Sequence, residues 1–198
     1  MNKNIVLLFI LFSTISLAET KIETTYLADL PPKGQDISYN KDGHIVRITT
    51  STWVDRVKTK DGLKYHKFEQ GFDYKLKQGF IKVYDENGKL INEKWNKDIS
   101  GGVAQEELLN AFALFKKHKT IQTHFKETDK KISIYGGFNF SDNKQCKLGN
   151  RCVHVMASTV DNPMLAHAIV RLIDSKVVYP DFDMDKSKWT IPHQKVSR

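Results

Sequence analysis

Strand, turn, strand and helix follow one another in residues 78–118, QGFIKVYDENGKLINEKWNKDISGGVAQEELLNAFALFKKH. The motif Asp85-Glu86-Asn87-Gly88 predicts a tight hairpin turn, because asparagine and glycine both tolerate positive φ. We therefore expect a strand that ends at this turn and a second strand that returns over residues 89–95. Upstream, the alternation of apolar and polar residues begins at Phe72 and changes parity at Gln78-Gly79. This change predicts one bent strand over residues 72–84, with a β-bulge at Gln78-Gly79.

Residues 103–118 form the one convincing helical pattern. Apolar residues recur at three- and four-residue spacing, which is the period of an amphipathic helix; they are Ala104, Leu108, Ala111, Phe112 and Phe115. Acidic residues lie in the first turn and lysines in the last turn, as the helix dipole favours. The pattern therefore predicts a helix whose apolar stripe packs against a sheet.

The remaining patterns predict strands on both sides of this helix. Upstream, a strand is expected over residues 44–54. Downstream, strands are expected over 131–140, 152–159, 164–173 and 177–179, the middle two joined as a hairpin around Val160 to Pro163. The predicted fold class is α+β, a curved antiparallel sheet packed on one main amphipathic helix. The predicted organisation is a signal peptide (1–18), an extended N-terminal arm (19–36), a single α+β domain (37–180) and a C-terminal tail (181–198).

The first eighteen residues have the pattern of a secretory signal peptide. Lys3 supplies the positive charge, residues 5–12 are uninterruptedly apolar, and Ser16 and Ala18 are small residues before the cleavage point. We expect cleavage between Ala18 and Glu19. The apolar run is shorter than the roughly 20 residues that span a bilayer. The sequence therefore predicts export, to a periplasm or the exterior, with no transmembrane span in the mature chain.

Cys146 and Cys152 are the two cysteines of the chain. An exported location favours a disulfide between them, because oxidising compartments preserve such bonds. A redox pair or half of a zinc site is the alternative, but a spacing of five intervening residues is not typical of either. We therefore predict a structural disulfide that closes a short loop.

The formal net charge of +8 indicates long-range attraction to anionic partners, such as polymers of the cell envelope. Solubility alone also accounts for scattered surface lysines. The sequence argues against nucleic-acid binding, because it has no arginine-rich helix and no aromatic RNA-binding motif. The partner is therefore expected to be a protein or an anionic envelope polymer, of unknown identity.

His154 and His167, with Met156 beside them, are the candidate metal ligands. If the hairpin folds about Val160-Asp161, His154 lies directly opposite His167. Paired imidazoles bind copper, zinc or haem iron, and a methionine favours copper. A different register separates the pair, so hairpin histidines without a metal are the simpler interpretation. The prediction is accordingly no metal and no cofactor.

The sequence contains none of the common catalytic motifs: no Gly-x-Ser-x-Gly, no His-Glu-x-x-His, no P-loop and no Gly-x-Gly-x-x-Gly. Glu106 and Glu107 could act as acids, but adjacent residues on a helix point in different directions, and the helix dipole explains both. These observations favour a protein that is not an enzyme and name no catalytic residue.

The segment from Gly102 to Tyr179, a helix followed by strands with VRLIDSKVV over residues 170–178, resembles the cystatin-like and PepSY-like α+β domains of exported proteins. The resemblance implies a non-catalytic domain that binds a protein, a peptide or an enzyme. It assigns no individual residue, since the Gln-x-Val-x-Gly hairpin of cystatin inhibitors has no match in this sequence.

Together these features predict an exported, non-enzymatic binding or inhibitory domain. The alternative is an exported hydrolase or metal-binding protein that uses His154 and His167. An open sheet with exposed aromatic residues would favour the first function, and a deep pocket that joins carboxylates to one of these histidines would favour the second.

Overall fold

The computed structural model describes residues 30–183. The predicted signal peptide, the cleavage point between Ala18 and Glu19, and residues 19–29 of the predicted arm lie outside the described residues. So do residues 184–198 of the predicted tail.

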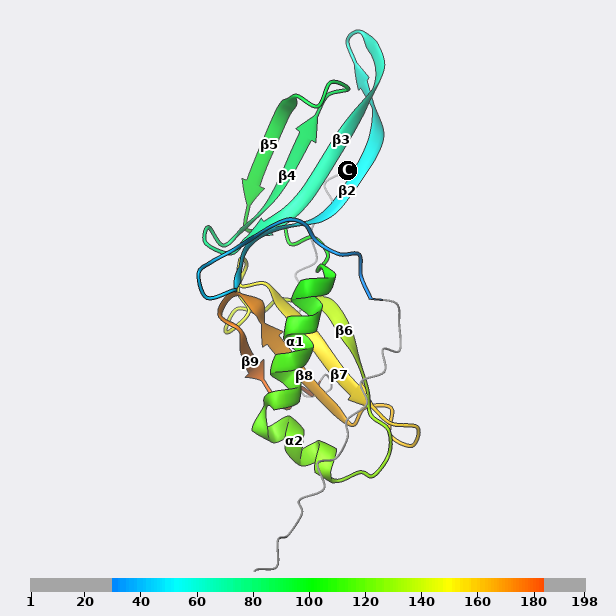
Figure 1. Ribbon diagram of the computed structural model, residues 1–198, viewed down its shortest axis with the longest axis vertical. Helices are drawn as coiled ribbons and strands as arrows, with labels where there is room; N and C mark the ends of the chain where they lie inside the picture. The colour runs from blue at the N-terminus through cyan, green and yellow to red at the C-terminus, as the bar shows by residue number, and fades with distance from the viewer. Residues whose placement is uncertain (1–29, 184–198) are drawn as a thin grey trace, which may run out of the picture.

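Strands β1 to β5 form the first sheet, an antiparallel meander in chain order at the top of Figure 1. Their bounds are β1 (Gln35–Tyr39), β2 (Ile45–Thr59), β3 (Gly62–Asp73), β4 (Gln78–Tyr84) and β5 (Leu90–Asn96). The predicted hairpin is confirmed between β4 and β5, where Gly88 has φ +76° and the Asp85 carboxylate accepts the N–H groups of Asn87 and Lys89. The side chain of Asp85 thus closes the turn that Gly88 allows.

The bent strand predicted over residues 72–84 is wrong, because β3 ends at Asp73 and a turn leads into β4. The Asp73 carboxylate accepts the Leu76 N–H at 2.8 Å, and Lys77 adopts φ +56°. Gly79 is needed for a close approach of two chains, since an added Cβ would lie 1.7 Å from the Ile99 carbonyl oxygen. The glycine therefore marks a packing contact and no bulge.

Helix α1 (Gln105–Lys117) confirms the predicted helix, and a second helix, α2 (Lys119–Lys126), follows it. His118 separates them in an extended conformation, with φ −72° and ψ 133°. Ile121 and Phe125 are one helical turn apart on α2 and are both buried. Neither helix within residues 30–183 is long and apolar enough to cross a membrane.

The second sheet consists of β6 (Ser133–Phe140), β7 (Cys152–Ser158), β8 (Ala166–Arg171) and β9 (Lys176–Tyr179), antiparallel and in chain order. The helices cover one face of this sheet (Figure 1). The resulting core joins α1 and α2 to alternate residues of β7 and β8, and includes Phe112, Phe115, Phe125, Val153, Val155, Ala168 and Val170. Burial of each large side chain stabilises the fold by about 1.5–3 kcal/mol.

The fold is therefore α+β, but its architecture differs from one sheet wrapped on one main helix. Two antiparallel sheets are present, and α1 packs against the strands of the second. The first sheet projects beyond the N-terminal end of α1 (Figure 1). Local patterns predict the strands but do not specify into how many sheets they assemble.

Candidate functional site

The predicted metal candidates lie on the face of the second sheet opposite the helices. A turn at Val160-Asp161 would place His154 directly opposite His167, but the observed register pairs His154 with Ile169 and Met156 with His167. The two histidines are therefore diagonal neighbours on one face, within reach of each other. His154 Nδ1 lies 2.9 Å from His167 Nε2. The sequence left the register open, and in the register that the structure adopts the imidazoles meet.

Aromatic side chains surround this histidine pair. The Phe140 ring is 5.1 Å from the His154 ring, and the Phe182 ring is 4.9 Å from the His167 ring, both in edge-to-face geometry. Tyr179 extends the cluster by contacting both phenylalanine rings. The pair therefore lies in apolar surroundings, with His167 buried and His154 half-buried.

These surroundings keep both imidazoles neutral at neutral pH. Burial, followed by the repulsion of a protonated His167, lowers the pKa of His154 to about 4. Burial also lowers the pKa of His167. Each neutral ring carries one N–H and one nitrogen lone pair, so one ring donates a hydrogen bond to the other.

Cys146 and Cys152 form the expected disulfide, with their Cα atoms 5.7 Å apart. Both cysteines are buried beside Ile169, in the small core that Phe140 and Phe182 cover. The disulfide therefore closes the 146–152 loop against the aromatic cluster.

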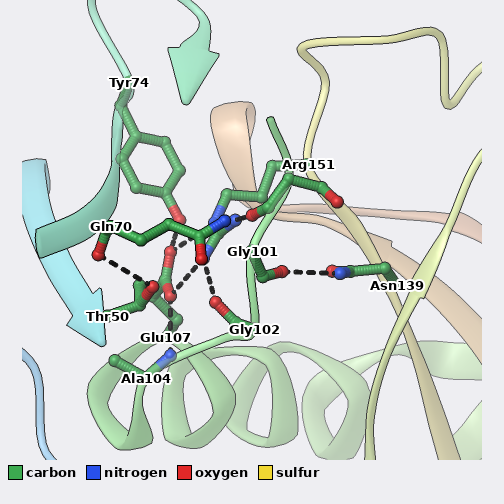
Figure 2. Close-up of polar contacts among 10 residues, drawn as sticks. Thr50, Gln70, Tyr74, Gly101, Gly102, Ala104, Glu107, Asn139 and Arg151 are labelled. Carbon is green, nitrogen blue, oxygen red and sulfur yellow. Dashed lines mark hydrogen bonds and ion pairs between the residues drawn. The ribbon is translucent and has the colours of Figure 1, made fainter. Parts of the chain in front are cut away.

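A buried ion pair, Glu107 with Arg151, lies where the two sheets meet (Figure 2). Both side chains are only 1% exposed. Arg151 Nε donates to Glu107 Oε1 at 2.5 Å, and Arg151 Nη2 donates to Oε2 at 2.7 Å. The same carboxylate accepts the Ala104 N–H at 2.8 Å and the Tyr74 hydroxyl. Glu107 thus caps α1 and also binds Tyr74, the residue that follows β3.

Arg151 connects this pair to the rest of the junction. Its guanidinium donates to the carbonyl oxygens of Ser100 and Gly102, and it lies 4.9 Å from the centre of the Phe72 ring. Burial alone would lower the pKa of Arg151, but Glu107 outweighs burial and raises that pKa, so the side chain stays charged. Burial and Glu107 raise the pKa of Tyr74 as well. The network therefore joins β3, the segment before α1, α1 and the disulfide loop.

Sequence reasoning missed this network, because it assigned Glu107 only to the helix dipole and gave Arg151 no role. Arg151 adopts φ +46°, a backbone conformation that side-chain-bearing residues seldom adopt. No motif marks it. The one local signal is its position directly before Cys152, within the loop that the disulfide closes.

A cavity of about 600 Å³ lies between the first sheet, the start of α1 and the turn at residues 172–175. Its carboxylates are already engaged: Glu106 accepts the Gly34 N–H, Glu107 pairs with Arg151, and Asp174 pairs with Arg171. Neither His154 nor His167 lines it. The cavity does not provide the arrangement expected of the hydrolase alternative.

A group of exposed apolar side chains lies on the part of the β2–β3 hairpin that projects past the other strands, residues 51–66, here called the distal hairpin (Figure 1). Strand β1 pairs with β2 only as far as Thr49, and β4 pairs with β3 only from Lys67 onward. The strands of the distal hairpin therefore pair only with each other. Three of its apolar side chains are strongly exposed, namely Val54 (64%), Leu63 (67%) and Tyr65 (58%).

The exposed apolar residues share one face of the hairpin with cationic side chains. The register places Arg56 opposite Tyr65 and Lys58 opposite Leu63. Directly opposed residues lie on the same face of a sheet, and so do residues two apart on one strand. Within the described residues, neither Arg56 nor Lys58 forms an ion pair. This face therefore combines apolar and positively charged groups.

Comparison with protein-family models and with curated proteins found no match for this chain.

Proposed function

We propose that this protein is an exported, non-catalytic binding protein whose distal hairpin docks an extended, acidic segment of a partner protein. The observation that carries the proposal is the pairing pattern. Strand residues 51–59 and 62–66 have no neighbouring strand on their outer sides, so both edges present backbone N–H and C=O groups that no strand pairs. Two of the N–H groups have carboxylate partners that an added strand would displace, since Arg56 N–H donates to Asp55 and Tyr65 N–H donates to Glu86. Such edges accept an added strand from another chain.

The side chains of the distal hairpin indicate what kind of segment would bind. Val54, Leu63 and Tyr65 offer apolar contact area, and Arg56 and Lys58 attract carboxylates. An extended segment that alternates apolar and acidic residues complements this face, since alternate side chains of a strand point the same way. Even without Lys3 of the predicted signal peptide, Lys and Arg outnumber Asp and Glu in the chain, and this excess of positive charge also favours a negatively charged partner.

Two further features support the proposal. The signal-peptide pattern of residues 1–18 and the Cys146–Cys152 disulfide fit an exported protein. In the segment from Gly102 to Tyr179, α1 lies ahead of four antiparallel strands, which fits the resemblance to cystatin-like and PepSY-like binding domains. An inhibitory role belongs to the same proposal, because an enzyme that received the hairpin in its substrate cleft would be blocked.

The test compares capture of partners from the exported fraction of the source organism by three baits. These are the mature chain (residues 19–198), the double variant Val54→Ser/Tyr65→Ala, and the control Leu148→Ser. Leu148 is 60% exposed but lies in the disulfide loop. We expect the wild type and the control to retain one protein at high salt. The double variant should retain it about thirtyfold less tightly, because truncating a central interface residue costs about 2 kcal/mol.

Hydrogen exchange on the captured complex gives the second readout. An added strand should slow exchange of the outward-facing amides in residues 51–59 or 62–66, which have no neighbouring strand on that side. The proposal fails if the double variant retains the protein as well as the wild type does. It also fails if retention falls smoothly with salt, because attraction to an anionic polymer alone would then account for binding.

A further inference from the structure

Three side chains with donor atoms for soft metals meet on the outer face of the second sheet. His154 and Met156 alternate along β7, and Met156 faces His167 on β8. Val153 and Val155, the residues on either side of His154, point into the helix-covered core. The pleat of the strands therefore brings two imidazoles and one thioether to one place.

The distance between the imidazoles suits a shared metal ion. His154 Nδ1 and His167 Nε2 converge to 2.9 Å, with a single proton between them. A metal ion in place of that proton would bind both nitrogens after a small separation of the rings. The displaced proton can move to the other nitrogen of its own ring, so binding requires no net proton release. Neither imidazole has to release a proton from a charged form first, because burial lowers the pKa of both and keeps them neutral.

The donor set selects the kind of ion. No group of three or more His, Cys, Asp and Glu side chains able to hold a metal occurs within residues 30–183. The two cysteines are joined in the disulfide. Calcium and magnesium require several oxygen ligands, and structural zinc sites require four strong ligands. Two imidazoles and a thioether are instead typical of copper sites, and the thioether favours the reduced ion.

The aromatic shell favours the same ion. Phe140 and Phe182 contact both edges of the histidine pair, and Met156 is 9% exposed. Apolar surroundings stabilise an ion of single charge better than one of double charge, because the cost of desolvation rises with charge.

From this geometry we propose that His154, His167 and Met156 form a binding site for one copper(I) ion. The site is independent of the distal hairpin, which belongs to the other sheet. It needs no redox step, because the ion is bound in the reduced form and released in the same form.

The experiment uses the untagged mature chain, titrated anaerobically with copper(I) against the chromophoric chelator bathocuproine disulfonate at pH 7.5. We expect one copper(I) per chain. Met156→Leu keeps the volume of the side chain but removes the thioether, and should weaken binding by at least about tenfold, as even loss of an outer-shell partner does. His167→Gln should weaken it further. The matched controls are Met164→Leu and His124→Gln, which alter an exposed methionine and a half-buried histidine elsewhere.

X-ray absorption on the copper-loaded wild type tests the ligands without any variant. We expect two nitrogen scatterers and one sulfur scatterer around the copper. The proposal is overturned if the wild type binds no copper(I), if the spectrum contains no sulfur, or if Met156→Leu binds as tightly as the wild type. It is also overturned if zinc binds to the wild type as tightly as copper(I) does and Met156→Leu leaves the affinity for both ions unchanged.

Discussion

Replacing Arg151 by methionine should be among the most destabilising single changes in the described part of the chain. The variant keeps most of the volume of the side chain but leaves the Glu107 carboxylate buried without its cation. Removing one partner of a buried ion pair costs about 3–5 kcal/mol, because the remaining charge is uncompensated. The backbone carbonyl groups of Ser100 and Gly102 lose their donors as well.

Two features of the junction keep the expected loss near the lower end of that range. The Ala104 N–H and the Tyr74 hydroxyl still donate to Glu107 in the variant, so the carboxylate keeps part of its hydrogen bonding. We therefore expect a loss of about 3 kcal/mol in the free energy of unfolding. The double variant Glu107→Leu/Arg151→Met removes both charges and should recover much of that loss.

Urea denaturation followed by tryptophan fluorescence and circular dichroism measures these values. The matched control is Arg171→Met, because Arg171 binds Asp174 at 2.8 Å but at the surface, with side chains 17% and 34% exposed. A surface pair contributes only about 0–1 kcal/mol. If Arg151→Met lost no more than Arg171→Met, the Glu107–Arg151 pair would not hold the junction and our reasoning would be refuted.

Two further predictions concern proton binding and backbone packing. The pKa of His154 is about 4 in the folded chain against 6.5 for a free histidine, so the unfolded chain binds its proton more tightly. The stability that the neutral His154 contributes is present above about pH 6.5 and is lost as the pH falls towards 4. His154 is partly exposed, so between pH 7.5 and 5.0 the wild type should lose about 1–2 kcal/mol more in its free energy of unfolding than His154→Gln does, measured by urea titration. Equal losses in both proteins would contradict the lowered pKa of His154. Gly79→Ala should cost about 3 kcal/mol, since the new Cβ would lie 1.7 Å from the Ile99 carbonyl oxygen. Gly102→Ala meets no atom within 4 Å and should be neutral or stabilising by up to about 1 kcal/mol in the same assay, so a similar loss at both glycines would rule out the packing argument.

Local signals in the sequence predicted much of the secondary structure. Asn87-Gly88 predicted the β4–β5 hairpin, and the three- and four-residue spacing of apolar residues predicted α1. The turn between β3 and β4 was missed because Tyr74-Lys75-Leu76-Lys77 contains no glycine, proline or asparagine. Its closure depends on the Asp73 side chain and on the positive φ of Lys77, and neither is evident from residue type alone.

The junction and the histidine register depend on contacts between distant segments. Glu107 and Arg151 are 44 residues apart, and nothing in their local sequence indicates that they pair. The register of β7 on β8 depends on how the loop around Val160 to Pro163 closes, where the Thr159 N–H donates to the Asn162 carbonyl oxygen. In the register of the structure the two histidines are diagonal neighbours, and they still meet because residues two apart on a strand share a face.

Packing and hydrogen bonds anchor the distal hairpin at its base, and this affects how it can bind. A two-stranded hairpin alone is marginally stable in water. At the base of this one, Trp53 stacks on Phe68 with ring centres 5.2 Å apart. On the opposite face, Glu69 accepts hydrogen bonds from Lys67 at 2.8 Å and from the Tyr84 hydroxyl at 2.9 Å. These contacts fix the base of the hairpin before a partner arrives.

This order reduces the cost of binding, because ordering flexible segments at an interface consumes part of the interaction energy. The same argument gives the Glu107–Arg151 pair a role beyond stability. The pair fixes the first sheet, and with it the distal hairpin, on α1 and the second sheet. Arg151→Met should therefore weaken partner capture even without urea and at a temperature at which the variant stays folded. Arg171→Met should not weaken it. Unchanged capture by folded Arg151→Met would show that the hairpin binds without support from the junction.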